Sequence, residues 1–172
     1  NHAALTYMTM KWWERRVIEK SSQIISFSES NARELRTGYG IPAEKVNVMA
    51  IPAAIPHDQV PETLSVRENL EPVRLLLVGR DYHRKGVDIA LEVVKQLNLE
   101  DVPAELRVVG LDGEGPEHAR FMGLYDKTIP EELTGYLNQY RWADFLIHPA
   151  RFEAAGIVPS EAAAFGVPTL TN

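Results

Sequence analysis

An apolar run, Val73–Val78, is the feature of this sequence that most narrows the choice of fold. The run is rich in branched side chains and Gly79 ends it, so we expect a buried strand. A helical stretch at 87–97 follows after a short loop, and a second apolar run at 104–109 comes next. Strand, helix and strand in this order predict parallel strands, and such a sheet needs helices on both faces.

The alternation of strands and helices continues in both directions. Downstream, the sequence predicts a short strand at 120–122, a helix at 130–141, a strand at 143–148 and a last strand that begins at 169–170. Upstream, it predicts helices at 10–20 and from Ser28 or Ser30 to 37, with strands at 23–27 and 45–50. Two strands alone do not make a covered parallel sheet, so the upstream part is typical of the end of a larger one.

A proline-rich stretch separates these two parts. Pro52, Pro56 and Pro61, with polar residues up to Pro72, indicate a linker at 56–72, and an ordinary surface loop is the alternative. We therefore interpret 1–55 as the end of one domain and 73–172 as a second domain.

The loop after Val78 carries three cations, which are Arg80, Arg84 and Lys85. A strand-to-helix loop lies at the carboxyl end of a parallel sheet, where such folds bind ligands. Arg80 and Lys85 are the predicted phosphate ligands, because a guanidinium can bind phosphate through two hydrogen bonds and an ammonium acts as a point charge. Arg84 and the neighbouring His83 are expected to face solvent.

Glu153 and Glu161 flank the expected start of a short helix. Pro159 suits a first helical turn, and Gly166 suits a left-handed end. The free amides after Gly156 and the positive end of the helix dipole predict an anion site between the two carboxylates. A carboxylate accepts hydrogen bonds from a diol, so the unit suits a ligand with sugar, phosphate and ribose in a row. Taken singly, either carboxylate could be an ordinary surface or dipole-complementing residue.

The composition excludes several kinds of site and argues against several kinds of partner. The 172 residues hold no cysteine, which excludes disulfides and zinc–thiolate sites, and the net charge of −6 argues against a general nucleic-acid surface. No apolar run approaches the roughly 18 residues of a membrane span. The five histidines are not spaced as a metal cluster, and His148 is expected to be packed and hydrogen-bonded. We expect no metal site and a cytoplasmic protein.

Together these elements resemble glycosyltransferase family 4, whose members are retaining enzymes of the GT-B fold. Two motifs carry the resemblance: G-R-x4-K-G at 79–86 and E-x7-E at 153–161. Further matches are LRVVG at 106–110, ADFLIHPARFE at 143–153 and FGVPTL at 165–170. The ordered set covers the chain from Val73 to its end, and 12–55 matches more loosely.

The resemblance implies an α/β fold, namely a Rossmann-like parallel sheet with helices on both faces, plus the end of a second Rossmann-like domain. It makes Glu153 the contact to the donor sugar and Glu161 the contact to the donor ribose. The implied catalytic residues are Arg80, Lys85 and Glu153. The implied donor-binding residues are Gly79, Arg80, Lys85, Glu153, Gly156, Ile157, Val158 and Glu161.

The implied reaction moves a hexosyl group from a nucleotide diphosphate sugar to an acceptor hydroxyl, with retention and without a metal or other cofactor. The partners would be the donor and a sugar or other hydroxyl acceptor. Trp12 and Trp13 are expected to pack against the rest of the larger sheet, with an aromatic membrane contact as the alternative. A peripheral membrane contact of a longer parent protein and its oligomeric state stay open. Alternatives are a sugar-nucleotide epimerase or phosphorylase of the same fold, or a non-catalytic nucleotide-sugar-binding module. We expect the isolated 172-residue piece to be inactive.

Overall fold

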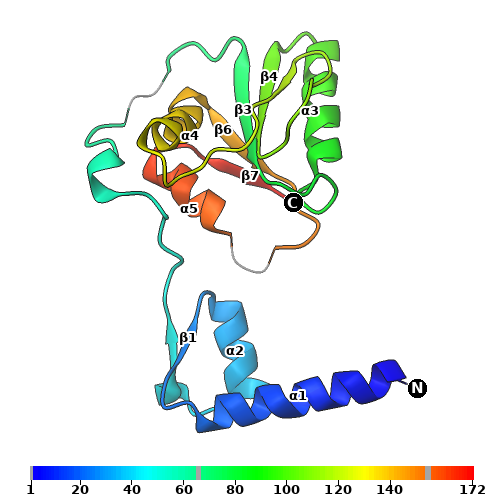
Figure 1. Ribbon diagram of the computed structural model, residues 1–172, viewed down its shortest axis with the longest axis vertical. Helices are drawn as coiled ribbons and strands as arrows, with labels where there is room; N and C mark the ends of the chain where they lie inside the picture. Colours follow the sequence, from blue (N-terminus) through cyan, green and yellow to red (C-terminus); the bar gives the residue numbers. More distant parts are fainter. Residues whose placement is uncertain (1, 65–66, 154–155) are drawn as a thin grey trace. The chain divides into compact units, whose positions relative to one another are not determined.

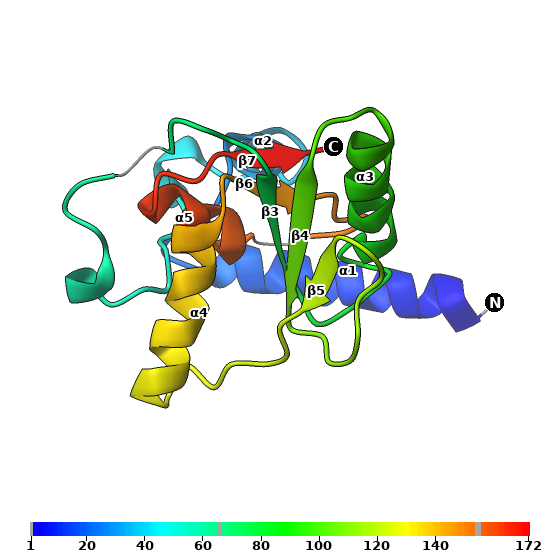
Figure 2. The ribbon, with the colours of Figure 1, turned by 90° about the horizontal axis from the view of Figure 1, so that it is seen from above.

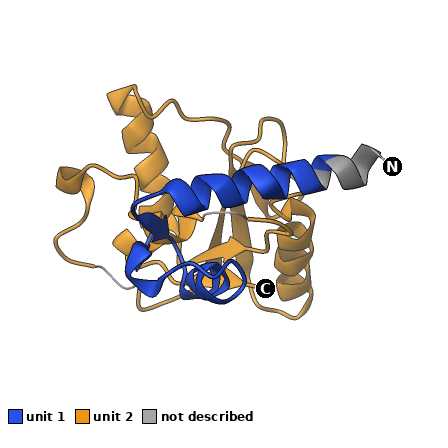
Figure 3. Ribbon diagram, turned by 90° about the horizontal axis from the view of Figure 1, so that it is seen from below, with its two compact units in different colours: residues 1–51 blue, residues 52–172 orange. Residues whose placement is uncertain are grey.

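The computed structural model describes residues 2–64, 67–153 and 156–172 of the chain. The chain forms two compact units, Asn1–Ile51 and Pro52–Asn172 (Figures 1 and 3). The whole of the predicted linker, 56–72, falls within the second unit, and its residues 65 and 66 lie outside the described residues. The domain boundaries at 55 and 72 stay a prediction. No helix of the described chain is long and apolar enough to cross a membrane.

The first unit pairs two short parallel strands with helices. Its elements are α1 (His2–Lys20), β1 (Ile24–Ser26), α2 (Glu29–Thr37), a 3-10 turn η1 (Ala43–Lys45) and β2 (Val46–Val48). Ser28 caps α2 as predicted, because its side chain accepts a hydrogen bond from the amide of Asn31 at 3.1 Å. Trp12 and Trp13 on α1 are 52% and 64% exposed, and the guanidinium carbon of Arg16 lies 5.1 Å from the centre of the Trp12 ring.

The second unit is a five-stranded parallel sheet in the order β5-β4-β3-β6-β7. Its elements are a 3-10 turn η2 (His57–Gln59), β3 (Val73–Val78), α3 (Val87–Leu99), β4 (Ala104–Val109), β5 (Ala119–Phe121), α4 (Pro130–Trp142), β6 (Phe145–His148), α5 (Ile157–Ala164) and β7 (Thr169–Thr171). Every strand and helix predicted for this half of the chain is present, with ends that differ by at most three residues.

The sheet of the second unit is covered on both faces (Figure 2). Alternate residues of β3 and β4, such as Leu75 and Leu106, pack against α3 on one face. Leu76 and Val109 point to the other face, where they pack with residues of α4 and α5. This two-sided burial is why β3 is an almost continuous apolar run. It confirms the predicted fold class.

The strand order places a topological switch point between β3 and β6. From β3 the chain proceeds to β4 and β5 on one side, and it then returns to β6 and β7 on the other. From the carboxyl end of the sheet, the chain leaves β3 for α3 on one face and leaves β6 for α5 on the other face. Open α/β sheets bind their ligands in the crevice formed there.

Candidate functional site

The loop after β3 and the loop after β6 bring Lys85 and Glu153 together. The ammonium of Lys85 donates to Oε2 of Glu153 in a close ion pair, and Nη1 of Arg84 lies 3.7 Å from the same oxygen. Burial alone would raise the pKa of Glu153, but the hydrogen bond and charge of Lys85 outweigh it and lower that pKa below its ordinary value. The carboxylate is therefore held ionised beside two cations.

Gly79 makes room for the stem of Lys85. A Cβ added at Gly79 would lie 2.4 Å from Cγ of Lys85, so a larger residue at the end of β3 would displace the lysine.

Arg84 was predicted to face solvent, and its side chain is 41% exposed, although it also forms ion pairs with Glu153 and Asp81. Arg80 is exposed at the rim of the pocket described below.

Arg151 holds the two loops together. Its amide donates to the carbonyl of Arg84 at 2.9 Å, and its Nη1 donates to the carbonyl of His83 at 2.7 Å. The same guanidinium forms two hydrogen bonds of 2.8 and 2.7 Å with the carboxylate of Asp88, in the first turn of α3. The segment that leads to Glu153 is thus anchored to the segment that carries Lys85.

This anchor predicts an acid-sensitive contribution to stability. Hydrogen bonding by Arg151 lowers the pKa of Asp88 from 3.8 to about 2. A carboxyl group with a lowered folded-state pKa stabilises fully above its unfolded pKa and loses that effect as the pH falls through the folded pKa. We expect the stability advantage of the native protein over Asp88→Asn to be constant above about pH 4 and to shrink between pH 4 and 2.

The measurement is the urea midpoint of both proteins at several pH values. Asp58→Asn is the matched control, because the structure gives Asp58 no ion pair among the described residues. A pH-independent difference between the native protein and Asp88→Asn would contradict the assignment of the stabilisation to the charged pair.

His148, at the end of β6, was predicted to be packed and hydrogen-bonded; the packing is confirmed, and the hydrogen bond is not found at Nε2 within the described residues. The residue is 8% exposed, yet its Nε2 has no hydrogen-bond partner within the described residues. This nitrogen lies 3.8 Å from Oε2 of Glu153. Burial and the nearby charge of Lys85 lower the pKa of His148, which keeps the ring neutral near pH 7. The carboxylate oxygen nearest to this nitrogen, Oε2 of Glu153, accepts from Lys85.

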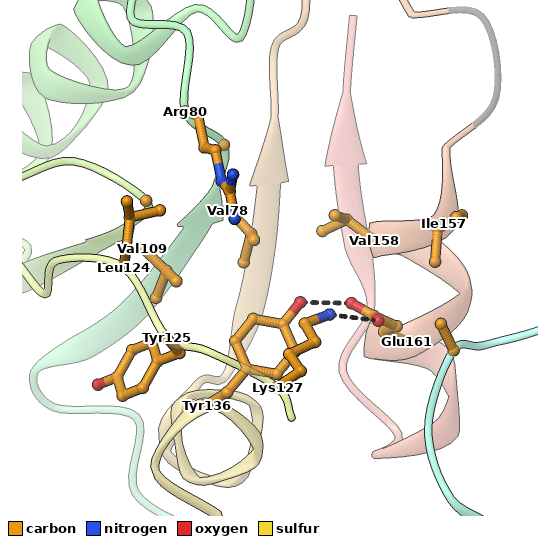
Figure 4. Close-up of a pocket in the computed structure, with 13 residues that line it drawn as sticks. Val78, Arg80, Val109, Leu124, Tyr125, Lys127, Tyr136, Ile157, Val158 and Glu161 are labelled. Carbon is orange, nitrogen blue, oxygen red and sulfur yellow. Dashed lines mark hydrogen bonds and ion pairs between the residues drawn. The ribbon is translucent and has the colours of Figure 1, made fainter. Parts of the chain in front are cut away.

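A pocket of about 260 Å³ opens beside this cluster at the carboxyl ends of β3 and β4 (Figure 4). Its walls are mostly apolar, with Val78, Val109 and Leu124 on one side and the first turn of α5 on the other. The complete lining is Ala54, Val78, Gly79, Arg80, Val109, Gly110, Leu124, Tyr125, Lys127, Tyr136, Ile157, Val158 and Glu161. Its polar groups come from the rim and from one buried carboxylate, which suits a partly apolar ligand with a few polar groups.

Glu161 is the buried carboxylate, and its side chain is only 1% exposed. Its Oε2 accepts hydrogen bonds from the hydroxyls of Tyr136 at 2.5 Å and Tyr140 at 2.7 Å. Its Oε1 accepts from the ammonium of Lys127 at 3.0 Å (Figure 4). Burial raises the pKa of both tyrosine hydroxyls, and the charge of Glu161 raises it further in Tyr136, so both remain donors.

The predicted site residues fall into two neighbouring groups. Lys85 and Glu153 form the ion pair, while Gly79, Arg80, Ile157, Val158 and Glu161 line the pocket. Helix α5 begins at Ile157 after Gly156, so its first turn lies between the two carboxylates as predicted. Their roles toward a ligand stay predictions. Sequence reasoning missed Lys127, Tyr136 and Tyr140; the two tyrosines are four residues apart on α4, a spacing that could have indicated one shared partner.

Comparisons with known proteins show which proteins the chain resembles. A family model described as "Glycosyl transferases group 1" matches residues 63–172. The chain is 29% identical to a D-inositol 3-phosphate glycosyltransferase of Kribbella flavida over 178 residues, which cover 91% of this chain and 42% of that protein. It is 28% identical to the lipopolysaccharide glucosyltransferase WaaG of Escherichia coli, over 93% of this chain and 46% of WaaG. The chain thus spans less than half the length of these relatives.

Solved structures extend the likeness to three dimensions. The crystal structure of WaaG, a glycosyltransferase involved in lipopolysaccharide biosynthesis, superposes with a TM-score of 0.57 and 26% identity, over 88% of this chain and 44% of that one. The catalytic domain of starch synthase IV from Arabidopsis thaliana, bound to ADP and acarbose, superposes with a TM-score of 0.58 and 16% identity. That match covers 91% of this chain and 40% of the synthase domain.

Proposed function

Since this chain belongs to the glycosyl transferases of group 1, we propose that its second unit binds the nucleotide diphosphate sugar of a hexosyltransferase. The whole protein would move the hexosyl group to an acceptor hydroxyl, on a sugar or another alcohol. The observation that supports this most is the meeting of two cations and Glu153 at the switch point, beside a pocket that ends at Glu161.

Each part of the proposed donor has a matching feature of the site. Lys85, Arg80 and the free amides at the start of α5 would hold the diphosphate, because cations and helix N-termini both favour anions. Glu153 would hold the transferred sugar. Glu161 would accept from the ribose hydroxyls, with the base against the apolar wall of the pocket.

The chemistry proposed here follows from charge. Departure of the nucleoside diphosphate leaves negative charge on the phosphate oxygens, and preorganised cations and amides stabilise it as it develops. We propose that these groups take the part that a metal ion plays elsewhere, that transfer proceeds with retention, and that the protein works in the cytoplasm. The donor base, the sugar and the acceptor are to be identified by experiment.

The division of labour between the two carboxylates is the test of this proposal. Glu161→Gln should weaken binding of the bare nucleoside diphosphate about tenfold, the scale of a hydrogen bond to a charged group. Glu153→Gln should not weaken that binding, and it should weaken binding of the sugar-bearing donor by a similar factor. Calorimetry with UDP, ADP and their hexose derivatives measures both.

Both substitutions keep the volume of the side chain, so loss of packing does not enter the comparison. Glu92→Gln on α3 serves as a control, since Glu92 pairs only with the surface residues Lys95 and Gln96 in the described structure. Equal losses for the two ligands in both variants would refute the division of roles. Absence of binding by the native protein to every nucleotide tried would refute the donor site itself.

A further inference from the structure

The two oxygens of Glu161 have different surroundings. Oε2 is occupied by two hydroxyls from α4, and the hydroxyls of Tyr136 and Tyr140 are themselves 2.8 Å apart. Both tyrosines are buried, with exposures of 3% and 0%, and their rings pack edge to face. The two hydroxyls fix the plane of the carboxylate and occupy both acceptor positions of Oε2. Only Oε1 is left to meet a ligand in the pocket.

Oε1 is the oxygen that Lys127 holds. Lys127 lies in the segment between β5 and α4, and its ammonium is 3.8 Å from the centre of the Tyr136 ring as well as 3.0 Å from Oε1. Its side chain is 42% exposed, while that of Glu161 is 1% exposed. The ammonium is therefore the partly solvated member of the pair, and it can leave at lower cost than the carboxylate can.

We propose that Lys127 competes with the ribose hydroxyls of the ligand for Oε1 of Glu161, and so sets how strongly the site selects a ribose diol. The inference rests on the proposed function, because it takes the pocket ligand to be a nucleotide. A diol that binds Oε1 must replace the ammonium, and part of its hydrogen-bond energy offsets the loss of that ion pair. A ligand without ribose hydroxyls leaves the pair intact and meets no such competition.

A hollow beside Lys127 can accept the displaced ammonium. Lys127 also lines a neighbouring hollow of about 510 Å³ with Arg80, Leu124, Tyr125 and Asp126. The carboxylate of Asp126 accepts hydrogen bonds from Thr128 and lies in the exposed part of this segment. Rotation of the long lysine side chain into this hollow keeps its charge in water and clears Oε1 without movement of the backbone.

The test compares ribose with its dideoxy analogue in Lys127→Met, which keeps the apolar stem and removes the charge. The measured quantity is the ratio of the Kd of 2′,3′-dideoxy-UDP to that of UDP, with the ADP pair alongside. Any general effect of the lost charge on the diphosphate is common to both ligands and cancels in this ratio. We expect this ratio to increase about tenfold in Lys127→Met, because UDP or ADP binds more tightly. The buried carboxylate oxygen has then lost its ion pair, so a hydrogen bond from an incoming hydroxyl stabilises it most.

Two further variants separate competition from other effects. Lys127→Arg keeps the cation and should leave the ratio near that of the native protein. Lys95→Met removes a charge from the exposed face of α3, where Lys95 pairs with Glu92, and should not change the ratio. Thermal unfolding of each variant verifies that it is folded before the titration.

The possible outcomes are distinct. If the native protein binds UDP or ADP and the Kd ratio stays constant or decreases in Lys127→Met, the inference is overturned and the proposed function still stands. Equal tightening or weakening for the ribose and dideoxy ligands would also overturn it, because Lys127 would then act on the base or the phosphates. A native protein that binds neither nucleotide would refute the proposed function, and the inference with it.

Discussion

Replacement of Gly86 by alanine is expected to lower the free energy of unfolding by about 3–5 kcal/mol, the sum of backbone strain and a steric clash. Gly86 has a φ of +68°, which side-chain-bearing residues rarely adopt, and an added Cβ would lie 2.2 Å from the carbonyl oxygen of Pro149. That carbonyl belongs to the backbone of the loop after β6, so it cannot rotate away. Urea denaturation followed by circular dichroism measures the effect.

Gly123→Ala is the control for backbone strain alone. Its φ of +72° is nearly the same, but its added Cβ would meet only the side-chain oxygen of Asp112, at 3.1 Å. We expect a loss of about 1–2 kcal/mol there. Equal losses in the two variants would mean that the loops after β3 and β6 do not pack as closely as described.

Lys85→Ala is expected to weaken binding of a nucleoside diphosphate by about 1.5–3 kcal/mol, the scale of a hydrogen bond between charged groups. The side chain of Lys85 is only 11% exposed, so water screens its charge little. Binding of the nucleoside without phosphates should hardly change, because the pocket around Glu161 does not contain Lys85. Calorimetric titrations of uridine and UDP, and of adenosine and ADP, give the two losses.

The control for Lys85→Ala is Lys95→Ala, which removes the same charge from a side chain that is 64% exposed. A variant Lys85→Arg should recover part of the diphosphate affinity. If Lys85→Ala loses equal affinity for the nucleoside and for its diphosphate, the lysine is not the phosphate ligand.

The sequence predicted best where local signals and tertiary packing agree. β3 and β4 have the predicted bounds, because each is an apolar run buried on both faces. The strand predicted at 143–148 begins at Phe145. Just before it, the amide of Asp144 donates to the carbonyl of Arg74, and the carboxylate of Asp144 accepts from the amide of Arg74 and from Arg67. α4 continues to Trp142, and the centre of the Trp142 ring lies 3.9 Å from the guanidinium carbon of Arg107 on β4.

The sequence motifs predicted most of the residues of the candidate site, but the sequence did not predict the contacts that these residues make. Gly79, Lys85, Glu153 and Glu161 stand out through their spacing, and the sheet brings them to one edge. Nothing local marks Lys127, because its contact to Glu161 joins residues that are 34 positions apart and depends on how the segment before α4 folds back. The helix predicted at 10–20 begins earlier, at His2, with no apolar repeat to reveal the start.

The anchor formed by Arg151 has a consequence for the thermodynamics of recognition. Its four acceptors, which are the carbonyls of His83 and Arg84 and both oxygens of Asp88, join Arg151 to the loop after β3 and to the first turn of α3 before any ligand arrives. The conformational entropy that flexible loops lose on association is in this case lost during folding. Loss of the Arg151 hydrogen bonds should therefore weaken the affinity for a ligand. The enthalpy of binding should stay largely the same, and the entropy of binding should become less favourable.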